Sequence, residues 1–351
     1  MRRHPPRDVC GHFSDESPTW QRLRIEDAVE TVPASLVAAF DAGTLLDVAV
    51  VVVIETRWAD KDIVIHARAE DGLAAESYLH DVLDRARGPE NHLRGRCLHV
   101  SSARGLTVAD IPRPDTRRED VIAPRAVWAE IDINVSALFS RRRLLGELGL
   151  GTNRGLLLVG PPGTGKSALC RVLAAELAGE VTVVFCAAST IADNLGALYS
   201  ELARLAPALV LMEDLDLAIG QRGRGRDEGL HAFLTALDGA MSHHDGVVTM
   251  ATTNDIRAVD PAATRAARFD RVIELPLPDE RARAAILRRY LGPLAGQVDT
   301  ADVAARTEGS SGADLRELVR RAVLAAGERV TTRDLLAAMR DGEGAAPGMY
   351  L

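Results

Sequence analysis

The sequence predicts an α/β protein with three parts: a small N-terminal α/β domain, a core built on a parallel sheet, and a C-terminal α-helical lid. Two observations predict the core and the lid. Beyond residue 150, short apolar runs alternate with helical segments, and such runs are typical of parallel strands buried on both faces. Beyond residue 279, apolar residues recur at helical spacing only, which indicates a helical domain.

The composition of the first 124 residues divides this stretch into a tail, a domain and a linker. Residues 1–20 are polar, with proline and histidine, so we expect a disordered tail. Residues 21–110 are expected to form the small α/β domain and carry no catalytic motif. Residues 111–124 combine prolines with many charges, which is typical of a linker. The elements expected in the domain are helices at 33–40 and 71–87 and strands at 46–56, 62–69 and 97–100.

The core is expected to span residues 125–278 and to begin with one helix over 126–148. Its expected strands are 155–159, 181–186, 208–212 and 246–251. The lid is expected over 279–342, with helices at 281–291, 301–306, 314–326 and 332–339. Residues 343–351 are rich in Gly, Ala and Pro and predict a flexible tail.

Composition and charge narrow the classes of function. The formal net charge of −8 argues against a general nucleic-acid-binding protein, which is normally basic. No apolar run reaches about 18 residues, so no membrane span is expected. The four cysteines are scattered and form no CxxC pair, which favours free thiols in a reducing compartment and hence a cytoplasmic protein.

A phosphate-binding loop follows the first apolar run of the core. Residues 160–167 match G-x-x-x-x-G-K-[ST], with an expected strand before them and a helix after them. The glycines let backbone N–H groups face phosphates, Lys166 reaches the β- and γ-phosphates of ATP, and Ser167 binds Mg²⁺. The sequence therefore predicts a P-loop nucleotide site for ATP and Mg²⁺. Its loop residues are Gly160, Pro161, Pro162, Gly163, Thr164, Gly165, Lys166, Ser167 and Ala168.

Acidic and amide side chains follow two later strands of the core. Glu213 and Asp214 come directly after the strand at 208–212, at the sheet edge where ligands bind in open α/β folds. Glu213 is expected to hold Mg²⁺, and Asp214 to polarise the attacking water as a general base. Asn254 follows the next strand, and its amide is expected to bond either the γ-phosphate or the water, with a turn-forming Asn as the alternative.

Two arginines, Arg265 and Arg268, lie three residues apart on an expected short helix. They are either a solvated helix face or charge-stabilising fingers supplied to a neighbouring subunit's nucleotide.

This ordered set of motifs resembles the AAA family of ATPases over about residues 124–340. The loop Gly-Pro-Pro-Gly-Thr-Gly-Lys-Ser is the family's usual one, and residues 259–271 (Val-Asp-Pro-Ala-x-x-Arg-x-x-Arg-Phe-Asp-Arg) resemble its second region of homology. Residues 311–315 (Ser-Gly-Ala-Asp-Leu) resemble the start of the lid helix that contacts adenine, which implies nucleotide contacts for Gly312 and Ala313. The resemblance implies that Asn254 is sensor 1, that Arg265 and Arg268 act in trans, and that the chain forms a ring, usually a homo-hexamer.

The sequence departs from the family's usual pattern at two places. The acidic pair is Glu213-Asp214 instead of Asp-Glu, an order that resembles the AAA branch that moves the folded Rieske iron–sulfur protein across the mitochondrial inner membrane. Residues 188–195 stand where the family's unfoldases carry an aromatic pore loop, and they contain no aromatic residue. This absence favours remodelling of a folded or bound protein over threading of an unfolded chain.

These observations predict a Mg²⁺-dependent AAA ATPase that remodels a protein partner recruited by residues 21–110. The alternative is a slow or non-hydrolysing nucleotide-dependent switch or scaffold, because of the Glu213-Asp214 order and the missing pore aromatic. A nucleic-acid remodelling role rests only on the Arg-rich segment 220–226, for which a solvated loop is the other interpretation. The last residues, Met349-Tyr350-Leu351, resemble the tail with which ring ATPases dock on core proteasomes, although three residues also match by chance.

Overall fold

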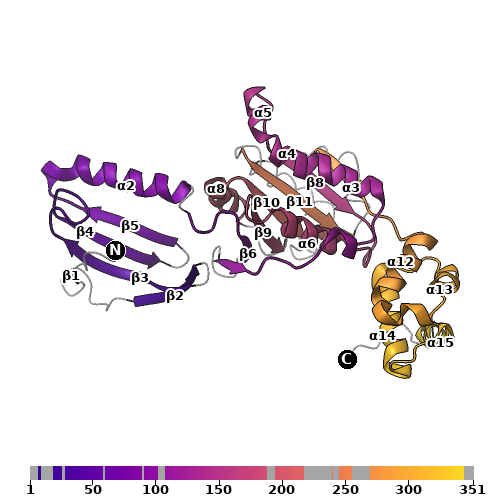
Figure 1. Ribbon diagram of the computed structural model, residues 1–351. Helices are drawn as coiled ribbons and strands as arrows, with labels where there is room; N and C mark the ends of the chain where they lie inside the picture. The colour runs from indigo at the N-terminus through magenta and orange to yellow at the C-terminus, as the bar shows by residue number, and fades with distance from the viewer. Residues whose placement is uncertain are drawn as a thin grey trace, which may run out of the picture.

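The computed structural model describes residues 7–8, 19–25, 28–57, 60–88, 91–101, 107–187, 194–216, 239, 245–254 and 269–343. They form an N-terminal antiparallel sheet with one long helix, a central sheet covered by helices, and a C-terminal helical lid (Figure 1). The predicted fold class, a parallel-sheet core with a helical lid and an additional N-terminal α/β unit, is confirmed.

The N-terminal part is a five-stranded sheet built around strand β3 (Ala28–Phe40). Strand β4 (Val50–Arg57) pairs with β3, and β5 (Asp60–His66) pairs with β4. Strands β1 (Arg7–Asp8) and β2 (Thr19–Ile25) also pair with β3, and every pairing is antiparallel. A short 3-10 turn (Ala69–Asp71) leads into helix α2 (Gly72–Arg87), which runs beside β5 (Figure 1).

The helix expected at 33–40 is wrong, because these residues form the end of β3. Leu36 and Ala38 are buried in one apolar cluster, whereas Val37 between them packs with Val53 in another. Side chains that alternate between two faces have the period of a strand. The helix-favouring Ala and Leu residues in this run therefore follow the tertiary context and not their own propensity.

The expected boundary at residue 110 is also displaced. Strand β6 (Cys97–Ser101) joins the central sheet, where it pairs in parallel with β9 (Thr182–Ala187). Strand β7 (Thr107–Ile111) pairs antiparallel with β6 and forms the edge of that sheet. Leu98 is fully buried in the core of the central sheet. A short strand with Cys97, Leu98 and Val100 as its apolar residues fits either sheet, so its sequence alone does not choose the partner strand.

The central sheet has seven strands in the order β12-β8-β11-β10-β9-β6-β7. Strands β8 (Arg154–Val159), β10 (Ala208–Glu213), β11 (Val247–Thr253) and β12 (Arg271–Glu274) run parallel with β9. The carboxyl ends of these five strands therefore meet at one edge, where ligands bind in open α/β sheets.

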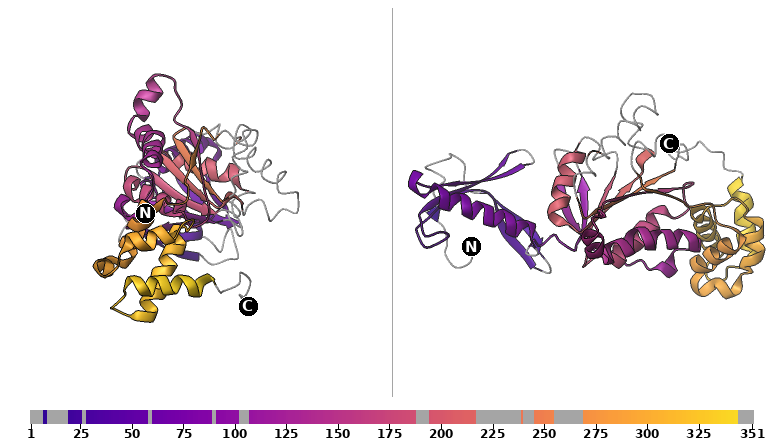
Figure 2. Two further views of the ribbon diagram at one scale, coloured as in Figure 1. Left: turned by 90° about the vertical axis from the view of Figure 1, so that its right-hand side faces the viewer. Right: turned by 90° about the horizontal axis from the view of Figure 1, so that it is seen from above.

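Helices cover both faces of the central sheet (Figure 2). Helix α8 (Leu195–Leu205) packs on one face, while α3 (Arg125–Ile131) and α6 (Lys166–Leu177) pack on the other. Residues of β8 alternate accordingly: Leu157 lies in the cluster with α8, and Leu156 in the cluster with α6. This two-sided burial explains the continuous apolar run of the strand.

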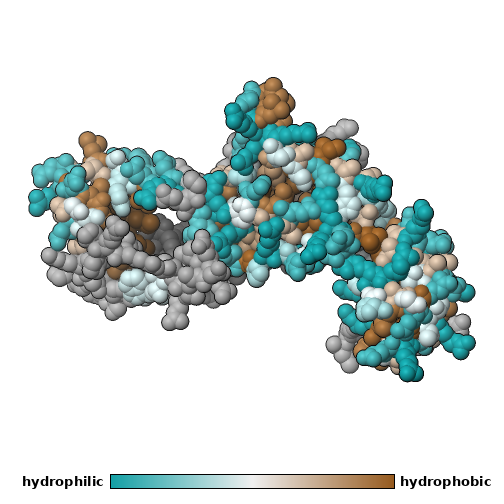
Figure 3. Space-filling view, in the orientation of Figure 1, coloured by the Kyte–Doolittle hydropathy of each residue, from teal (hydrophilic) through white to brown (hydrophobic). Residues whose placement is uncertain are grey.

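The single helix expected over 126–148 is interrupted. After α3 comes a π-helical turn (Asp132–Ser136), then α4 (Ala137–Ser140) and α5 (Arg142–Glu147). The junction residue Arg141 leaves the helical conformation with φ −107° and ψ 10°. Beyond it, α5 projects from the core with apolar atoms at its end (Figures 1 and 3), where Leu144 and Leu148 are 53% and 62% exposed. Leu145 of α5 still packs against the core cluster, whereas Leu144 and Leu148 stay exposed.

The lid is helical, as expected, with its own apolar core. It consists of α12 (Glu280–Leu291), a 3-10 segment (Gly292–Gln297), α13 (Thr300–Arg306), α14 (Gly312–Ala326) and α15 (Thr332–Glu343). Side chains cap three of the helices: Asp279 accepts from Ala282 N–H, Asp299 accepts from Ala301 N–H and Asp302 N–H, and Ser311 forms a capping box with Asp314. Across the described stretches of all three parts, no helix is both long and apolar enough to span a membrane.

Candidate active site

The phosphate loop lies between strand β8 and helix α6, as the sequence predicts. Gly165 has φ +106° directly before α6 begins at Lys166, a conformation that favours glycine. Gly163, with φ +78°, also lets the lid approach, because a Cβ there would lie 2.5 Å from Ser311 Oγ. The lid in turn donates a hydrogen bond from Ala313 N–H to the carbonyl oxygen of Gly163 (3.1 Å). The loop is therefore shaped both for phosphates and for contact with α14.

Lys166 is buried, with 6% of its surface exposed. Its ammonium donates to the carbonyl oxygens of Gly160 (2.7 Å) and Pro161 (3.0 Å) and to Asn254 Oδ1 (2.7 Å). Burial lowers the pKa of Lys166, and the nearby carboxylates of Asp216 and Asp214 partly oppose that shift. The site thus holds a cation whose partners are neutral oxygens, ready to exchange them for phosphate oxygens.

The acidic residues Glu213 and Asp214 occupy different surroundings at the end of β10. Asp214 lines the cavity in front of the loop, has φ +56°, and donates its N–H to Thr252 Oγ1 (3.1 Å). A left-handed conformation at a non-glycine residue is uncommon, and such strain gathers at functional sites. Glu213 is half-buried and is not among the residues that line the cavity. Burial of the Cys170 and Cys186 thiols, and to a smaller extent the nearby negative charge of Glu213, raises the pKa of both thiols to about 12.

Asn254, at the end of β11, joins the loop to a further carboxylate. Its side-chain Nδ2 donates to Asp216 Oδ2 (3.3 Å), and its backbone N–H donates to Asp216 Oδ1 (3.2 Å). Thr253 Oγ1 also donates to Asp216 Oδ1 (3.2 Å). Asp216 is a functional candidate that the sequence analysis missed; its position two residues after Asp214 was the available signal.

A cavity of about 360 Å³ connects the phosphate loop, the strand ends, the linker and the lid, a size within the usual range for small-molecule sites. It is lined by Asp120, Val121, Ile122, Pro162, Gly163, Thr164, Gly165, Lys166, Ser167, Ala168, Arg171, Asp214, Thr252, Asn254, Ile286, Arg289, Tyr290, Gly312, Ala313 and Arg316. The structure thus brings together most of the predicted nucleotide-binding residues, including Gly312 and Ala313 of the lid.

The end of the cavity away from the loop is formed by the linker and the lid. Arg289 of α12 forms an ion pair with the carboxylate of Asp120 (2.9 Å), and its Nε donates to the Asp120 carbonyl oxygen (2.6 Å). Tyr290 and Arg316, also from the lid, line the same region. The sequence analysis missed Asp120, Arg289, Tyr290 and Arg316, because nothing in their separate surroundings shows that they meet.

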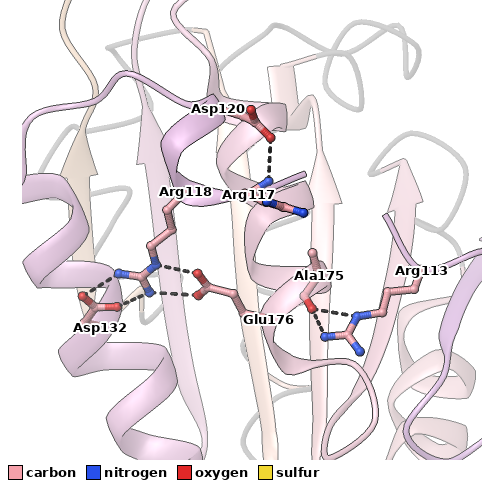
Figure 4. Close-up of polar contacts among 7 residues, drawn as sticks. All are labelled: Arg113, Arg117, Arg118, Asp120, Asp132, Ala175 and Glu176. Carbon is pink, nitrogen blue, oxygen red and sulfur yellow. Dashed lines mark hydrogen bonds and ion pairs between the residues drawn. The ribbon is translucent and has the colours of Figure 1, made fainter. Parts of the chain in front are cut away.

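The linker is fastened to the helix that starts at the phosphate loop (Figure 4). Arg118 lies between two carboxylates: its Nε donates to Glu176 of α6 (2.6 Å), and its Nη1 donates to Asp132 (2.9 Å). Arg113 Nε donates to the carbonyl oxygen of Ala175 (2.7 Å). Hydrogen bonds to the two carboxylates raise the pKa of Arg118, so the guanidinium is permanently charged. Arg118 also lies 4.9 Å from the ring of Trp128, within cation–π range.

Several predicted features fall outside the described residues. These are the finger candidates Arg265 and Arg268, the segment 188–193 at the expected pore position, the Arg-rich segment 220–226, and the tail Met349–Leu351. Their predicted roles stay predictions.

The residues present fit ATP with Mg²⁺. A Cβ at Gly163 would meet the lid, so the loop and the lid enclose the cavity closely, while the Lys166 cation and the start of α6 supply positive charge for phosphates. Ser167 and Asp214, which both line the cavity, supply hard oxygen atoms of the kind that Mg²⁺ prefers. Mg²⁺ would neutralise charge on the phosphate oxygens during hydrolysis. The loop, the parallel sheet and the lid together define a P-loop nucleotide-hydrolysing protein.

Comparison with protein-family models identifies the family of P-loop proteins to which this chain belongs. Residues 156–277 match the model of the ATPase family associated with various cellular activities (AAA), and residues 297–341 match that of the AAA+ lid domain. The chain belongs to the AAA family of ATPases and uses ATP and Mg²⁺, which confirms the predicted family, enzyme class and cofactors.

Similar curated proteins carry the name ATP-dependent zinc metalloprotease FtsH. The one from Acidothermus cellulolyticus is 39% identical over 243 residues, covering 64% of this chain and 36% of its own length. FtsH 3 of Sphaerobacter thermophilus is 37% identical over 258 residues, covering 67% of this chain and 51% of its own length. The chain therefore spans about a third to a half of these relatives. It contains no His-Glu-x-x-His. Among its described residues there is no group of three or more His, Cys, Asp and Glu side chains that could hold a metal ion.

Proposed function

We propose that this AAA ATPase assembles into a ring and uses ATP hydrolysis to remodel a protein partner that binds its N-terminal sheet. The observation that carries the proposal is the position of the linker. Val121 is buried in the core cluster, whereas its neighbour Ile122 packs against the lid cluster, and both line the nucleotide cavity. A change of bound nucleotide that moves the lid therefore acts on this segment, which continues back along the chain through β7 and β6 of the central sheet to α2 and the N-terminal sheet.

The contacts of the linker make this coupling direct. Asp120 is bonded to Arg289 of the lid, while Arg118 two residues earlier is bonded to Glu176 at the far end of α6. Helix α6 starts at the phosphate-binding Lys166. The linker is thus bonded at one point to the lid and at another to the phosphate-loop helix, so their relative movement is transmitted to it.

The N-terminal sheet is the proposed site for the protein partner. It lies outside the AAA match and has its own apolar cluster around Leu36 and Phe40. Strand β5, at the edge of this sheet, exposes Ile63 and Val64, each at 44%. Unpaired strand edges with apolar side chains are common docking places for extended polypeptides.

Assembly with further copies of the chain is supported by exposed apolar groups on the core. Leu144, Leu148 and Leu150 at the projecting end of α5 are 53%, 62% and 55% exposed. Grouped exposed leucines of this kind favour burial against another protein surface. A ring would also give the predicted finger residues Arg265 and Arg268 a neighbouring nucleotide to contact.

The proposed function is tested first by steady-state ATP hydrolysis across protein concentration, with Mg²⁺ and with excess chelator. Specific activity should rise with protein concentration, because sites completed by a neighbour form only in the assembly, and chelation should abolish turnover. Specific activity that is independent of concentration while sedimentation shows a monomer would refute the ring. Tight Mg²⁺–ATP binding without turnover would favour the nucleotide-dependent switch instead.

Mixing variants tests action between subunits. Arg265→Ala lacks a proposed finger, and Asp214→Asn lacks the proposed base, so each protein alone should be nearly inactive. In a randomly mixed ring, about a quarter of the sites combine an intact base with an intact finger from the neighbour. Recovery of about a quarter of wild-type activity on mixing is expected, whereas two inactive proteins that stay inactive in a shared ring would contradict the trans role.

Nucleotide-dependent hydrogen exchange on the full chain tests the coupling to the partner site. Mg²⁺ with a slowly hydrolysed ATP analogue should change protection in the linker 113–122 and in α2, relative to ADP. A change confined to the phosphate loop would contradict transmission to the N-terminal part.

A cytoplasmic location is part of the proposal, because the described cysteines Cys97, Cys170 and Cys186 are free and buried, which suits a reducing compartment. Fractionation of cells that carry the tagged chain measures the location, and recovery from an oxidising compartment would contradict it.

A further inference from the structure

The orientation of the Asn254 amide is fixed by its two side-chain partners. One partner, the Lys166 ammonium, has only donors, and the other, the Asp216 carboxylate, has only acceptors. The amide oxygen must therefore face Lys166 and the amide nitrogen must face Asp216. A flipped amide would place N–H groups against the ammonium and oxygen against the carboxylate, so the chemistry of the partners settles an assignment that distance alone does not.

Asp216 holds this arrangement without touching the cavity. Its carboxylate accepts three hydrogen bonds from the end of β11, from Asn254 N–H (3.2 Å), Asn254 Nδ2 (3.3 Å) and Thr253 Oγ1 (3.2 Å). Asn254 and Lys166 line the cavity, whereas Asp216 does not. Asp216 is thus linked to the nucleotide site by hydrogen bonds through Asn254, while its charge also acts on Lys166.

We propose that Asp216 is a positioning residue for ATP hydrolysis, which holds the Asn254 amide with its oxygen toward the cavity as a hydrogen-bond acceptor for the attacking water. In the structure that oxygen is bonded to Lys166. When Lys166 moves to the phosphates, the oxygen is released beside Asp214, which also lines the cavity. The water then donates one proton to the general base Asp214 and is oriented through its other hydrogen by Asn254. This inference rests on the hydrolytic activity of the site.

The first test substitutes Asp216→Asn in the 351-residue chain. The side-chain NH₂ of the new amide would face the side-chain NH₂ of Asn254. The Asn254 amide would then flip, turn its NH₂ toward Lys166, and no longer present its oxygen as an acceptor at the cavity. Turnover should fall about 10- to 100-fold, as expected for loss of orientation, while the Kd of a fluorescent Mg²⁺–ATP analogue changes less than about threefold.

The matched control is Asp245→Asn. Asp245 precedes β11 at its opposite end and accepts hydrogen bonds from Thr152 N–H (2.8 Å) and Thr152 Oγ1 (2.7 Å), away from the cavity. This variant should lose stability without the selective loss of turnover. Equal turnover losses in the two variants would show that Asp216 serves only to hold the sheet end.

A swapped pair makes the inference specific. In Asp216→Asn combined with Asn254→Asp, the new amide at 216 keeps its oxygen toward Thr253 and donates to the new carboxylate at 254, whose second oxygen faces Lys166. The double variant should hydrolyse ATP at least about tenfold faster than Asp216→Asn alone. No recovery in a folded double variant, or a Kd defect as large as the turnover defect, would overturn the inference. If the wild-type protein itself shows no turnover, the hydrolytic function fails instead.

A double-mutant cycle that combines Asp216→Asn with Asn254→Ala provides the second measurement. If Asp216 acts through Asn254, then Asp216→Asn should lower turnover little further in the Asn254→Ala background. Additive losses would show that Asp216 acts independently of the amide.

Discussion

The two ends of the nucleotide cavity are built in different ways. The phosphate end comes from one continuous loop and the adjoining strand ends, and its cation Lys166 is only 6% exposed. The other end, which we call the base end because the adenine base of ATP is expected there, comes from three separate segments: the linker, α12 and α14. There the ion-paired side chains of Arg289 and Asp120 are 40% and 29% exposed.

This difference suggests that the phosphate end holds the reacting groups, whereas the base end allows the lid to move. Buried polar groups with fixed partners hold their geometry, because breaking their hydrogen bonds is costly. Partly exposed ion pairs contribute little stability, so the contacts at the base end can break and re-form as the lid moves. We therefore expect substitutions at the phosphate end to abolish activity and substitutions at the base end to adjust it.

The largest effect is expected from Lys166→Ala. The loop would lose its phosphate-facing cation, and turnover should fall at least about 100-fold, as for removal of other groups that stabilise a charged transition state. Arg143→Ala on the exposed helix α5 is the control and should keep full turnover. Phosphate release measures both, and wild-type turnover in Lys166→Ala would remove the distinction between the two ends.

Gly163→Ala tests the contact between the phosphate loop and helix α14 of the lid. A Cβ here would lie 2.5 Å from Ser311 Oγ and 2.8 Å from Ala313 Cβ, so the lid must move away from the loop. We expect about tenfold weaker ATP binding, in addition to backbone strain of about 1–3 kcal/mol. Gly149→Ala is matched, because Gly149 also has positive φ (+67°) but no atom within 4 Å of its added Cβ. Equal ATP affinities in the two variants, measured by calorimetry, would show that the lid contact is unimportant.

Arg118→Ala tests the attachment of the linker. Loss of the contacts to Asp132 and Glu176 should lower the free energy of unfolding by about 1–2 kcal/mol, a modest value because these side chains are partly exposed. Arg143→Ala again serves as control, since the Arg143 side chain is 92% exposed and its pair with Glu147 should be worth about 0.3–0.5 kcal/mol. Denaturant unfolding gives the values, and an equal change in both variants would mean that the linker is not held by Arg118.

The smallest effect is expected from Arg289→Ala at the base end. ATP binding should weaken about two- to fivefold at low salt, because the lid loses its pair with Asp120. The difference from wild type should shrink as salt rises from about 0.05 M to 0.5 M, since salt screens exposed charges. Binding titrations at both salt concentrations measure it. A large, salt-independent defect would place Arg289 with the phosphate end.

The same comparison explains what the sequence could predict. The phosphate end is one contiguous motif, so the loop, Lys166 and Ser167 were identified directly from it, and the strands that carry Asp214 and Asn254 were identified from their apolar runs. The base end unites Asp120, Arg289 and Tyr290, and only the folded chain brings them together. Strand β6 was assigned to the wrong unit for a related reason, because an apolar run specifies burial but not which strand it pairs with.

The neighbouring residues Val121 and Ile122 have a further consequence. The backbone at Val121 is extended, with φ −121° and ψ 109°, so consecutive side chains point to opposite sides, one into the core and the next toward the lid. One inserted or deleted residue here would exchange the two sides, as a one-residue shift does in a strand. Surface connections usually vary in length without harm. This short stretch instead has a fixed length, so domain fusions and loop grafts in this protein should leave it intact.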